Sequence, residues 1–278
     1  MKKLIHSIIL SLAAIAAFSQ SNIVVKYNES SNNDGGIAIV SKMTLIASPQ
    51  KSLYYNVMSQ YVDSCRSTPE GAARLRELQL KAWRVDYPDG SFSYEGRKLG
   101  LAPDKNVYLY VDKEISADRM TVYDQKSDEL CCYSEPLSEM SWTINSDSIM
   151  NILGYDCILA QADYHGRLWK AWFTPEIPLH DGPWKLHGLP GIILKADGGD
   201  GFGIEATEIG TTPLPVPEVY SKGNYGKSER KKILADHEHF INHFESIMNA
   251  QNIKLNADGS PANLSTFNRQ SSAWETDY

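Results

Sequence analysis

Short runs of alternating apolar and polar residues, separated by turn dipeptides, constrain the fold of this chain more than any other feature. Residues 106–111, 155–162, 167–174 and 202–206 alternate with a period of two and are rich in aromatic and β-branched side chains. This pattern is typical of half-buried β-strands. Asp-Gly occurs six times, and both residue types tolerate the positive φ of tight hairpins. Strands joined by short turns pair with their neighbours in the chain, so we expect an antiparallel meander without βαβ units.

Large apolar side chains lie on both faces of the predicted strands. Residues 167–174, for example, place Trp169 on one face and Trp172 on the other. A strand with two apolar faces indicates a sheet that is covered on each side, or one that curves around its contents.

Two stretches carry helical signals. Residues 69–82 open with Pro69 after the candidate N-cap Thr68, which is a typical helix start. Residues 228–249 carry an apolar stripe at helical spacing. We therefore expect a mainly β protein with helices, of the α+β class: a curved antiparallel meander sheet, one helix in the N-terminal half and an amphipathic helix near the C-terminus.

Composition divides the chain into three consecutive segments. They are a signal peptide at 1–19, an antiparallel β domain at 20–211 with a helical insertion near 69–82, and a segment at 212–278. The last segment holds a proline-rich linker, which is a stiff spacer, followed by the helix at 228–249 and a polar tail.

The first residues predict export. Lys2 and Lys3 precede a mostly apolar stretch at 4–18, and small residues precede a cleavage point that we place after Ser19. No cysteine lies near that point, which argues against a lipoprotein anchor. No later run approaches the roughly 18 apolar residues that span a bilayer. We expect a soluble mature protein without a membrane span, either periplasmic or secreted.

The charge balance argues against a nucleic-acid partner. Removing Lys2 and Lys3 from the 27 Lys and Arg leaves 25 basic side chains against 34 acidic ones, a net charge of −9. Binding to phosphates requires clustered basic charge, and the longest basic run is Arg230-Lys231-Lys232.

Four cysteines in an exported chain raise the question of disulfides. Cys65, Cys131, Cys132 and Cys157 allow three pairings, between which the sequence does not choose. Cys131 or Cys132 is a candidate partner for Cys157, and buried free thiols are the alternative. A metal site is not expected, because no C-x-x-C pair is present.

Aromatic residues are concentrated between positions 155 and 184. Alternation sends Trp169 and Trp172 to opposite faces, so one ring belongs to the core and the other could line a surface groove. Together with Trp184 and Tyr155 they form a candidate groove for an apolar or sugar ligand.

Signals for catalysis are sparse. The chain has no G-x-S-x-G, H-E-x-x-H or G-x-x-x-x-G-K motif. His180 and Asp181 could act as a base and its orienting partner, but no nucleophile is evident. Asp197 and Asp200 stand among glycines in a pattern that calcium accepts, although a hairpin turn needs the same residues. We therefore predict no catalytic residue, no bound metal and no cofactor.

A second metal hypothesis concerns the C-terminal helix. His239 and His243 stand four residues apart on one helix face, with Asp236 nearby. A solvated helix face explains the same spacing more simply.

The stretch Gly188-Leu189-Pro190-Gly191 predicts a sharp turn. Pro190 fixes its own φ and biases Leu189 away from helix. With Pro190 at the second position and Gly191 at the third, a type II turn is expected. The apolar residues that follow should form a buried strand, so we interpret this stretch as a structural corner.

The same stretch carries a resemblance to a known family. Residues 152–194, ILGYDCILAQADYHGRLWKAWFTPEIPLHDGPWKLHGLPGIIL, resemble the signature region of the GLPGLI family of exported Bacteroidota proteins. Residues 51–64, KSLYYNVMSQYVDS, resemble the N-terminal segment of that family, and Ile192 replaces a Leu of the family name. The resemblance implies a cell-envelope location, genes beside outer-membrane TonB-dependent uptake systems, and a curved antiparallel sheet akin to periplasmic lipoprotein carriers. It transfers no catalytic residues.

These observations favour a non-enzymatic binding or accessory protein of the cell envelope. Its expected partner is an apolar small molecule, a lipid or an outer-membrane transport protein. The alternative is a hydrolase or metal-binding protein that uses the His and Asp residues around 180–200. The sequence leaves the oligomeric state open.

Overall fold

The computed structural model describes residues 21–32, 38–93, 107–127, 129–242 and 275–277, together with residues 103 and 105. The predicted signal peptide and the end of the helix predicted at 228–249 lie outside these residues.

The chain forms two compact units that interleave along the sequence. Unit 1 comprises Met1–Tyr54, Val111–Thr121 and Ser134–Glu218, and unit 2 comprises Tyr55–Tyr110, Val122–Tyr133 and Val219–Tyr278. The sequence had led us to expect consecutive segments. The interleaving arises because β6, β7 and β8 each run from one unit into the other, and composition carries no signal for that.

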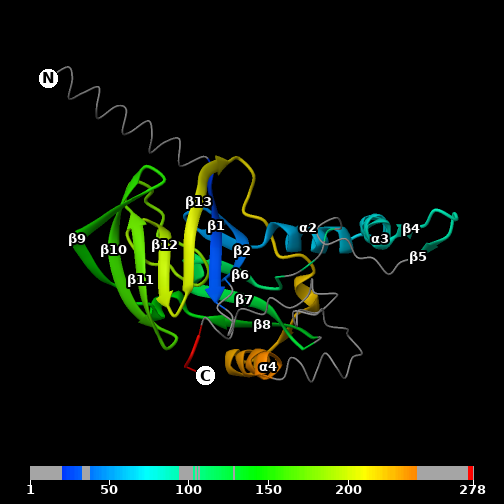
Figure 1. Cartoon of the computed structure of the whole chain (residues 1–278). Helices are drawn as coiled ribbons and strands as arrows, with labels where there is room; N and C mark the ends of the chain where they lie inside the picture. The colour runs from blue at the N-terminus through cyan, green and yellow to red at the C-terminus, as the bar shows by residue number, and fades with distance from the viewer. Residues whose placement is uncertain are drawn as a thin grey trace, which may run out of the picture. The chain divides into compact units, whose positions relative to one another are not determined.

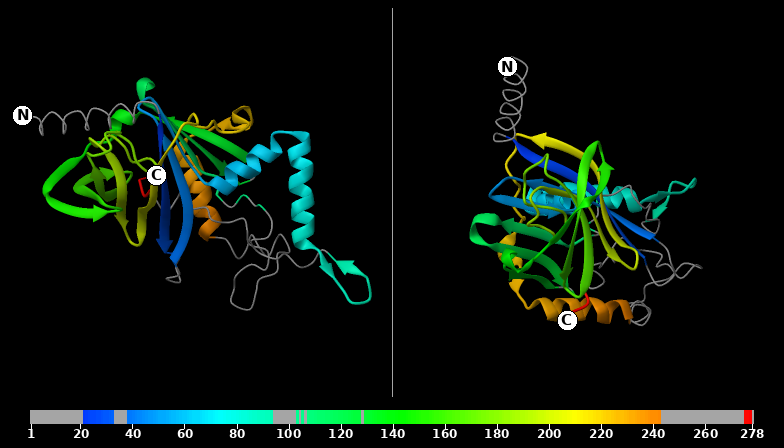
Figure 2. Two further views of the ribbon diagram at one scale, coloured as in Figure 1. Left: turned by 90° about the horizontal axis from the view of Figure 1, so that it is seen from above. Right: turned by 90° about the vertical axis from the view of Figure 1, so that its left-hand side faces the viewer.

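Unit 1 is built from a large curved antiparallel sheet (Figures 1 and 2). Its strands are β1 (Asn22–Asn32), β2 (Ala38–Ala47), β3 (Lys51–Tyr55), β6 (Tyr110–Glu114), β9 (Thr143–Ile152), β10 (Tyr155–Tyr164), β11 (Arg167–Thr174), β12 (Ile192–Gly199) and β13 (Phe202–Thr212). The strands β7 (Arg119–Lys126) and β8 (Glu129–Glu135) are divided between the two units. The 3-10 turns η1 (Ile115–Ala117) and η2 (Leu137–Glu139) follow β6 and β8. The mainly β, α+β class with a curved antiparallel sheet is thereby confirmed.

Strand order in unit 1 is β6-β3-β2-β1-β13-β12-β11-β10-β9. Strands that are neighbours in the chain pair within two meanders, β1–β3 and β9–β13. The two meanders meet where β1 pairs with β13, from Asn22↔Thr212 to Ser30↔Gly203, and β6 lies beside β3. Short turns predict the pairing within each meander. The β1–β13 pairing joins strands about 180 residues apart and has no local signal.

The inner face of the unit 1 sheet packs against the connection between β11 and β12. Trp169 on β11 is fully buried, and its ring lies 5.2 Å from that of Trp184 in the connection. Tyr164 on β10 meets Trp184 edge-on at 6.2 Å. A Cβ at Gly182 would lie 2.8 Å from Ile193, so glycine permits the close approach of the connection to β12. The connection therefore fills the concavity of the sheet.

Unit 2 contains the helices and the small hairpin of the chain. Its elements are α2 (Val57–Arg66), α3 (Pro69–Trp83), α4 (Arg230–Asn242), β4 (Val85–Asp86), β5 (Phe92–Ser93), η3 (Lys222–Asn224) and β14 (Gly226–Lys227), which pairs in parallel with β8. The helix expected at 69–82 is α3, which begins where the Thr68 hydroxyl accepts the Gly71 N–H at 3.1 Å. Asn56 caps α2 in the same way. The β4–β5 hairpin follows α3 (Figure 2).

The strand predicted at 106–111 is wrong in its position. The described residues 107–109 are not strand, and β6 begins only at Tyr110. The Tyr110 hydroxyl donates to Asp63 of α2 at 2.7 Å, and Lys105 pairs with the same carboxylate. The Lys105 ammonium also lies over the rings of Tyr108 and Tyr110. These contacts with α2 hold the segment in an irregular conformation despite its alternation.

Only the first part of the apolar stripe predicted for helix α4 is described by the structure. There Ile233, Leu234 and His237 are buried, and His237 Nε2 lies 2.7 Å from the Gln125 carbonyl oxygen. Asp236 accepts the backbone N–H and the hydroxyl of Ser127 at 2.7 and 2.6 Å, which is a structural role. His239 is exposed, and His243 lies outside the described residues.

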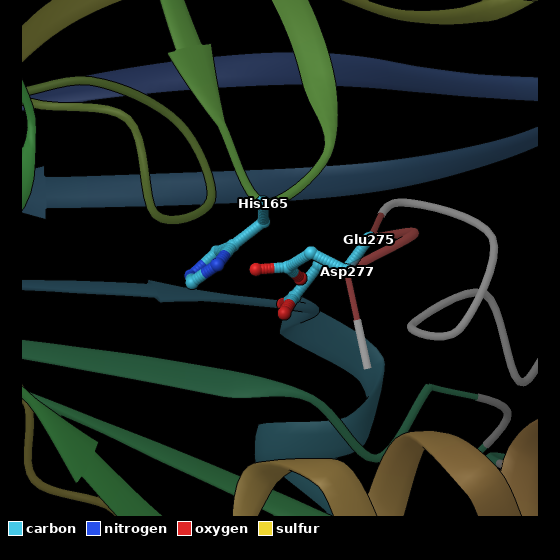
Figure 3. A group of neighbouring side chains, drawn as sticks. All are labelled: His165, Glu275 and Asp277. Atoms are coloured by element: carbon cyan, nitrogen blue, oxygen red, sulfur yellow. The ribbon is translucent and has the colours of Figure 1, made fainter.

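A C-terminal segment of unit 2 is tied to the start of α4. The Arg230 guanidinium donates to both carboxylate oxygens of Asp277 at 2.7 and 3.1 Å, and it also contacts Glu275. Figure 3 shows how the side chains of Glu275 and Asp277 project from this segment. The two carboxylates raise the pKa of Arg230 against the opposing effect of desolvation. No helix in the described part of the chain combines the length and the apolar character needed to cross a membrane.

Candidate functional site

The predicted aromatic groove is divided between the interior and the surface of unit 1. Trp169 and Trp184 are buried and pack on each other, so these two rings are core residues and face no ligand from solvent. Trp172 and Tyr155 are half-buried. As alternation predicts, Trp172 lies on the face opposite Trp169, which is the outer face of the sheet.

The glycine-proline stretch is a corner, but it is not a type II turn. The Gly191 N–H donates to the Leu189 carbonyl oxygen at 2.8 Å, across Pro190. The Ile192 N–H, which would close a type II turn on Leu189, instead donates to Ile177 at 3.0 Å. Leu189 is buried, and Ile192 opens the buried strand β12. The long-range bond to Ile177 therefore replaces the local one.

A buried ion pair holds the segment that precedes this corner. Lys113 on β6 has no exposed surface, and its ammonium donates to Asp181 Oδ1 at 2.6 Å, to the Gly182 carbonyl oxygen at 2.8 Å and to that of Leu186 at 3.1 Å. All three ammonium hydrogens are therefore used. Burial lowers the pKa of Lys113, while the Asp181 charge and hydrogen bond oppose that shift. Asp181 is thus a structural anchor, and this role differs from the alternative in which it orients His180 for catalysis.

A second polar cluster, around the half-buried Glu135, lies beside the aromatic core. Glu135 accepts from the Lys185 ammonium at 2.8 Å, and its other oxygen lies 3.3 Å from His165 Nε2. His165 lies at the turn between β10 and β11 (Figure 3). Although desolvation opposes it, the contacts with His165 and Lys185 lower the pKa of Glu135 to about 2. Burial lowers the pKa of His187, which lies two residues beyond Lys185.

The four cysteines are free thiols in the structure. Burial, the largest cause, raises the pKa of Cys131 to about 12 and that of Cys157 to about 11. Cys131 is buried and Cys132 is half-buried, as expected for neighbours on opposite faces of a strand. The structure therefore agrees with the alternative of free thiols, and it contains no disulfide from Cys131 or Cys132 to Cys157.

The outer face of the unit 1 sheet carries a row of mostly polar side chains that crosses six strands. Each member lies directly opposite the next in the strand register, so all of them share one face. None of them is buried. From β10 to β2 the row is Leu159, Trp172, Lys195, Glu205, Asn28 and Lys42.

A second row runs beside the first, two residues along each strand. From β10 to β2 it is Gln161, Lys170, Asp197, Gly203, Ser30 and Val40. Gly203 interrupts the row with no side chain, and a Cβ there would lie 3.1 Å from the Ser30 hydroxyl oxygen. The absence of a side chain at Gly203 therefore leaves a depression in the outer face of the sheet.

Two adjoining hollows follow these rows. The first, of about 550 Å³, is bounded by side chains that include Asn28, Ser30, Lys195, Glu205 and Thr207. The second, of about 340 Å³, is bounded by Arg167, Leu168, Lys170 and the turn 197–200. Asp197 lines both hollows. We call the two hollows together the sheet groove.

Charges in the sheet groove are largely paired. Lys195 and Glu205 form an ion pair of 3.0 Å, and Arg167 pairs with Asp200 at 3.2 Å. The Arg167 guanidinium also donates to the Gly198 carbonyl oxygen at 3.1 Å. An arginine thus takes the carboxylate and the carbonyl oxygen that a calcium ion would need. The Asp197 carboxylate accepts the Gly199 N–H at 2.8 Å. This is the role in a hairpin turn that the sequence offered as the alternative to a calcium site.

The four residues of the hydrolase alternative do not form one site. His180 and Asp181 line a pocket of about 240 Å³, whereas Asp197 and Asp200 line the sheet groove. The Asp181 carbonyl oxygen accepts the Ile193 N–H. Asp197 stands four residues further along β12, at about 13 Å for a strand rise of roughly 3.3 Å.

The 240 Å³ pocket, here called the His180 pocket, does bring Ser48 to the same place as His180 and Asp181. Ser48 uses its hydroxyl inside the β2–β3 turn, where it donates to the Lys51 carbonyl oxygen and accepts the Lys51 N–H. Among the described residues, no hydrogen bond joins Ser48 to His180 or His180 to Asp181. A catalytic triad requires both contacts.

Sequence analysis missed most of the residues that shape these sites. Lys113 lies beyond the end of the strand predicted at 106–111, and Asn28, Ser30 and Gly203 become neighbours only through the β1–β13 pairing. Alternation along β12 and β13 could have identified the half-buried Lys195 and the exposed Glu205. No local signal could have placed Asn28 beside them.

Comparison with known proteins gives one short family match. A family model described as a protein of unknown function (Porph_ging) matches residues 166–195, from the β10–β11 turn into β12. No curated protein matches the chain. The GLPGLI resemblance and an origin in Bacteroidota stay predictions.

Two similar solved structures are those of PNGF-II in the C2 and P21 space groups. They share 13% and 14% sequence identity with this chain, each with a TM-score of 0.48. The alignments cover 78% of this chain but only 32% and 34% of the PNGF-II chains, so this chain spans about a third of their length.

Proposed function

We propose that this chain is an exported, non-enzymatic binding protein of the cell envelope that holds a hydrophilic ligand in the sheet groove of unit 1. The observation that carries the proposal is the pair of hollows that meet at Asp197 on a solvent-facing sheet surface. Export rests on the predicted signal peptide at 1–19. An outer-membrane transport partner stays a prediction from the family resemblance.

The composition of the sheet groove favours a hydrophilic ligand over the apolar one expected from the sequence. Its walls offer an amide at Asn28, hydroxyls at Ser30 and Thr207, and charged groups of both signs. Such a set both donates and accepts hydrogen bonds. The two large rings that could have bound an apolar molecule, Trp169 and Trp184, are used in the core.

A neutral polyhydroxylated molecule, such as a saccharide, matches this surface best. Hydroxyl groups donate and accept hydrogen bonds, as the side chains of the groove do. The paired charges Lys195–Glu205 and Arg167–Asp200 leave no large excess of one sign to attract an ion. Trp172 stands beside Lys195 in the row and offers a half-exposed ring on which a sugar face could stack.

Saccharide binding by the mature chain tests the proposal. We expect a screen of neutral oligosaccharides to give binding that calorimetry can measure, and Asp197→Asn to weaken it about tenfold, since hydrogen bonds to a charged group contribute about 1.5–3 kcal/mol. Asp163→Asn is the matched control, because Asp163 is exposed on β10 and lines neither hollow. Absence of saccharide binding, or equal losses in the two variants, would contradict the proposal.

A further inference from the structure

Four glycines lie in and beside the β12–β13 turn, and the fold accounts for three of them. Gly199 and Gly201 have φ values of 75° and 80°, a region of backbone conformation that favours glycine. A Cβ at Gly198 would lie 2.9 Å from the ring of the buried Trp169, so close packing requires glycine there. The fourth glycine, Gly203 on β13, has neither reason.

The surroundings of Gly203 leave room for a side chain. Its φ lies outside the left-handed region. A Cβ there would lie 3.1 Å from the Ser30 hydroxyl oxygen, a contact that rotation of the serine side chain relieves, and 3.8 Å from the Ala196 carbonyl oxygen, an ordinary contact. A glycine inside a strand weakens the strand, and it often marks a place where a ligand approaches the backbone closely. Gly203 is therefore better explained by binding than by folding.

The depression at Gly203 has polar walls on three sides. Ser30 lies opposite Gly203 on β1, and Asp197 lies opposite it on β12. Glu205 stands two residues along β13, on the same face of the sheet. All four residues line the hollow of about 550 Å³. Two strand spacings separate the backbones of Ser30 and Asp197, so the gap between them is roughly 10 Å wide, which suits one sugar ring lying flat.

A pyranose ring has the chemistry that these walls need. Its faces carry C–H groups that can lie against the peptide backbone of Gly203, where no side chain intervenes. Its edge carries hydroxyls that both donate and accept hydrogen bonds, as the Ser30 hydroxyl does, and that can donate to the Asp197 carboxylate. A side chain at position 203 would lift the ring away from both partners.

We infer that Gly203 is the floor of a subsite that takes one pyranose ring of a neutral saccharide, and that the missing side chain at this position is what admits the ring. This inference rests on the proposed function, because it assigns a place to the ligand within the sheet groove.

Thermal unfolding of the mature chain tests whether the fold requires this glycine, and it needs no ligand. Gly203→Ala should keep or raise the Tm of the wild type, because a residue with a Cβ stabilises a strand relative to glycine. Gly210→Ala is the matched control: Gly210 lies on the same strand and the same face, opposite Val24, and nothing lies within 4 Å of a Cβ there. A Tm lower by about 5 °C or more in Gly203→Ala alone would give the glycine a structural role and overturn the inference.

Calorimetric titration with cellotriose and maltotriose, two neutral trisaccharides of pyranose rings, tests the subsite. The saccharide that binds the wild type should bind Gly203→Val at least about tenfold more weakly, which corresponds to the loss of one or two hydrogen bonds. Gly210→Val should bind it as the wild type does. If Gly203→Val does not fold, Gly203→Ala decides, with an expected loss of at least about threefold.

The outcomes separate the subsite from the proposed function. Wild-type affinity in a folded Gly203→Val, or in Gly203→Ala where the valine variant is unfolded, would overturn the subsite and leave saccharide binding in place. Failure of both trisaccharides to bind the wild type would contradict the proposed function and the subsite together.

Discussion

At the scale of single residues, Glu29 is the least expected side chain of unit 1. It lies on β1 with only 2% of its surface exposed, and the Tyr54 hydroxyl donates to its Oε1 at 2.7 Å. Burial raises the pKa of Glu29 to about 7, and the hydrogen bond from Tyr54 only partly opposes this shift. In the folded protein the carboxyl therefore holds its proton at pH values where an exposed glutamate is ionised.

This shift predicts a specific pH dependence of stability. Because the pKa is raised from 4.5 to about 7 on folding, the folded state binds more protons than the unfolded state in that window. The free energy of unfolding should then fall by roughly 3 kcal/mol as the pH rises from about 4.5 to above 7. Urea unfolding at pH 5 and pH 8 should show this loss in the wild type and a much smaller one in Glu29→Gln.

The control for this experiment is Glu208→Gln, since Glu208 is exposed and paired only with Lys26 on the surface. It should keep the pH dependence of the wild type. If Glu29→Gln and the wild type lose the same free energy of unfolding between pH 5 and pH 8, the pKa of Glu29 is not the cause of the pH dependence.

At the scale of elements, the end of β11 and the start of β12 are held together through a glycine. A Cβ at Gly191 would lie 2.1 Å from the Thr174 carbonyl oxygen, which is backbone and cannot rotate away. Gly191 is therefore required by close approach, and the long-range hydrogen bond from Ile192 to Ile177 depends on the same proximity.

Gly191→Ala should consequently destabilise unit 1 by about 3 kcal/mol or more, since an overpacked site costs about 1–3 kcal/mol even where side chains can adjust. Gly210→Ala is the matched control on β13, because nothing lies within 4 Å of a Cβ there. It should change stability by less than about 0.5 kcal/mol. Thermal unfolding of both variants checks this, and equal stabilities would show that the corner can relax.

Element boundaries differed in how well the sequence predicted them. The run at 167–174 matches β11, and the helix expected at 69–82 is α3, because each has a clear period and a clear start or turn signal. Helix α2 was not predicted, since it has only ten residues and its position depends on the Asn56 cap and on contacts with α3.

At the scale of the whole molecule, the state of the cysteines depends both on the compartment of the protein and on how they are packed. Compartment alone favours disulfides, yet Cys131 and Cys157 are buried thiols with raised pKa values. Thiols of this kind react slowly, because the thiolate is the nucleophile.

Thiol counting tests this arrangement. We expect four free thiols per chain in denaturant without reductant, and we expect iodoacetamide on the native protein to spare Cys131 and Cys157 while modifying the half-buried Cys65 first. Mass spectrometry of the labelled peptides measures both. A count of two thiols, or early labelling of Cys157, would contradict the structure.

The sequence by itself determined the strand character of the chain, the inner and outer faces of β11, and the presence of a corner at 188–191. These properties depend on side-chain alternation and on the local geometry of proline and glycine. Tertiary structure alone decided that β1 pairs with β13, that Lys113 meets Asp181, and that the sheet groove forms at Asp197. The reason is that strands pair through backbone N–H and C=O groups, which are the same in every residue, so the choice among distant strands depends on how the whole chain packs.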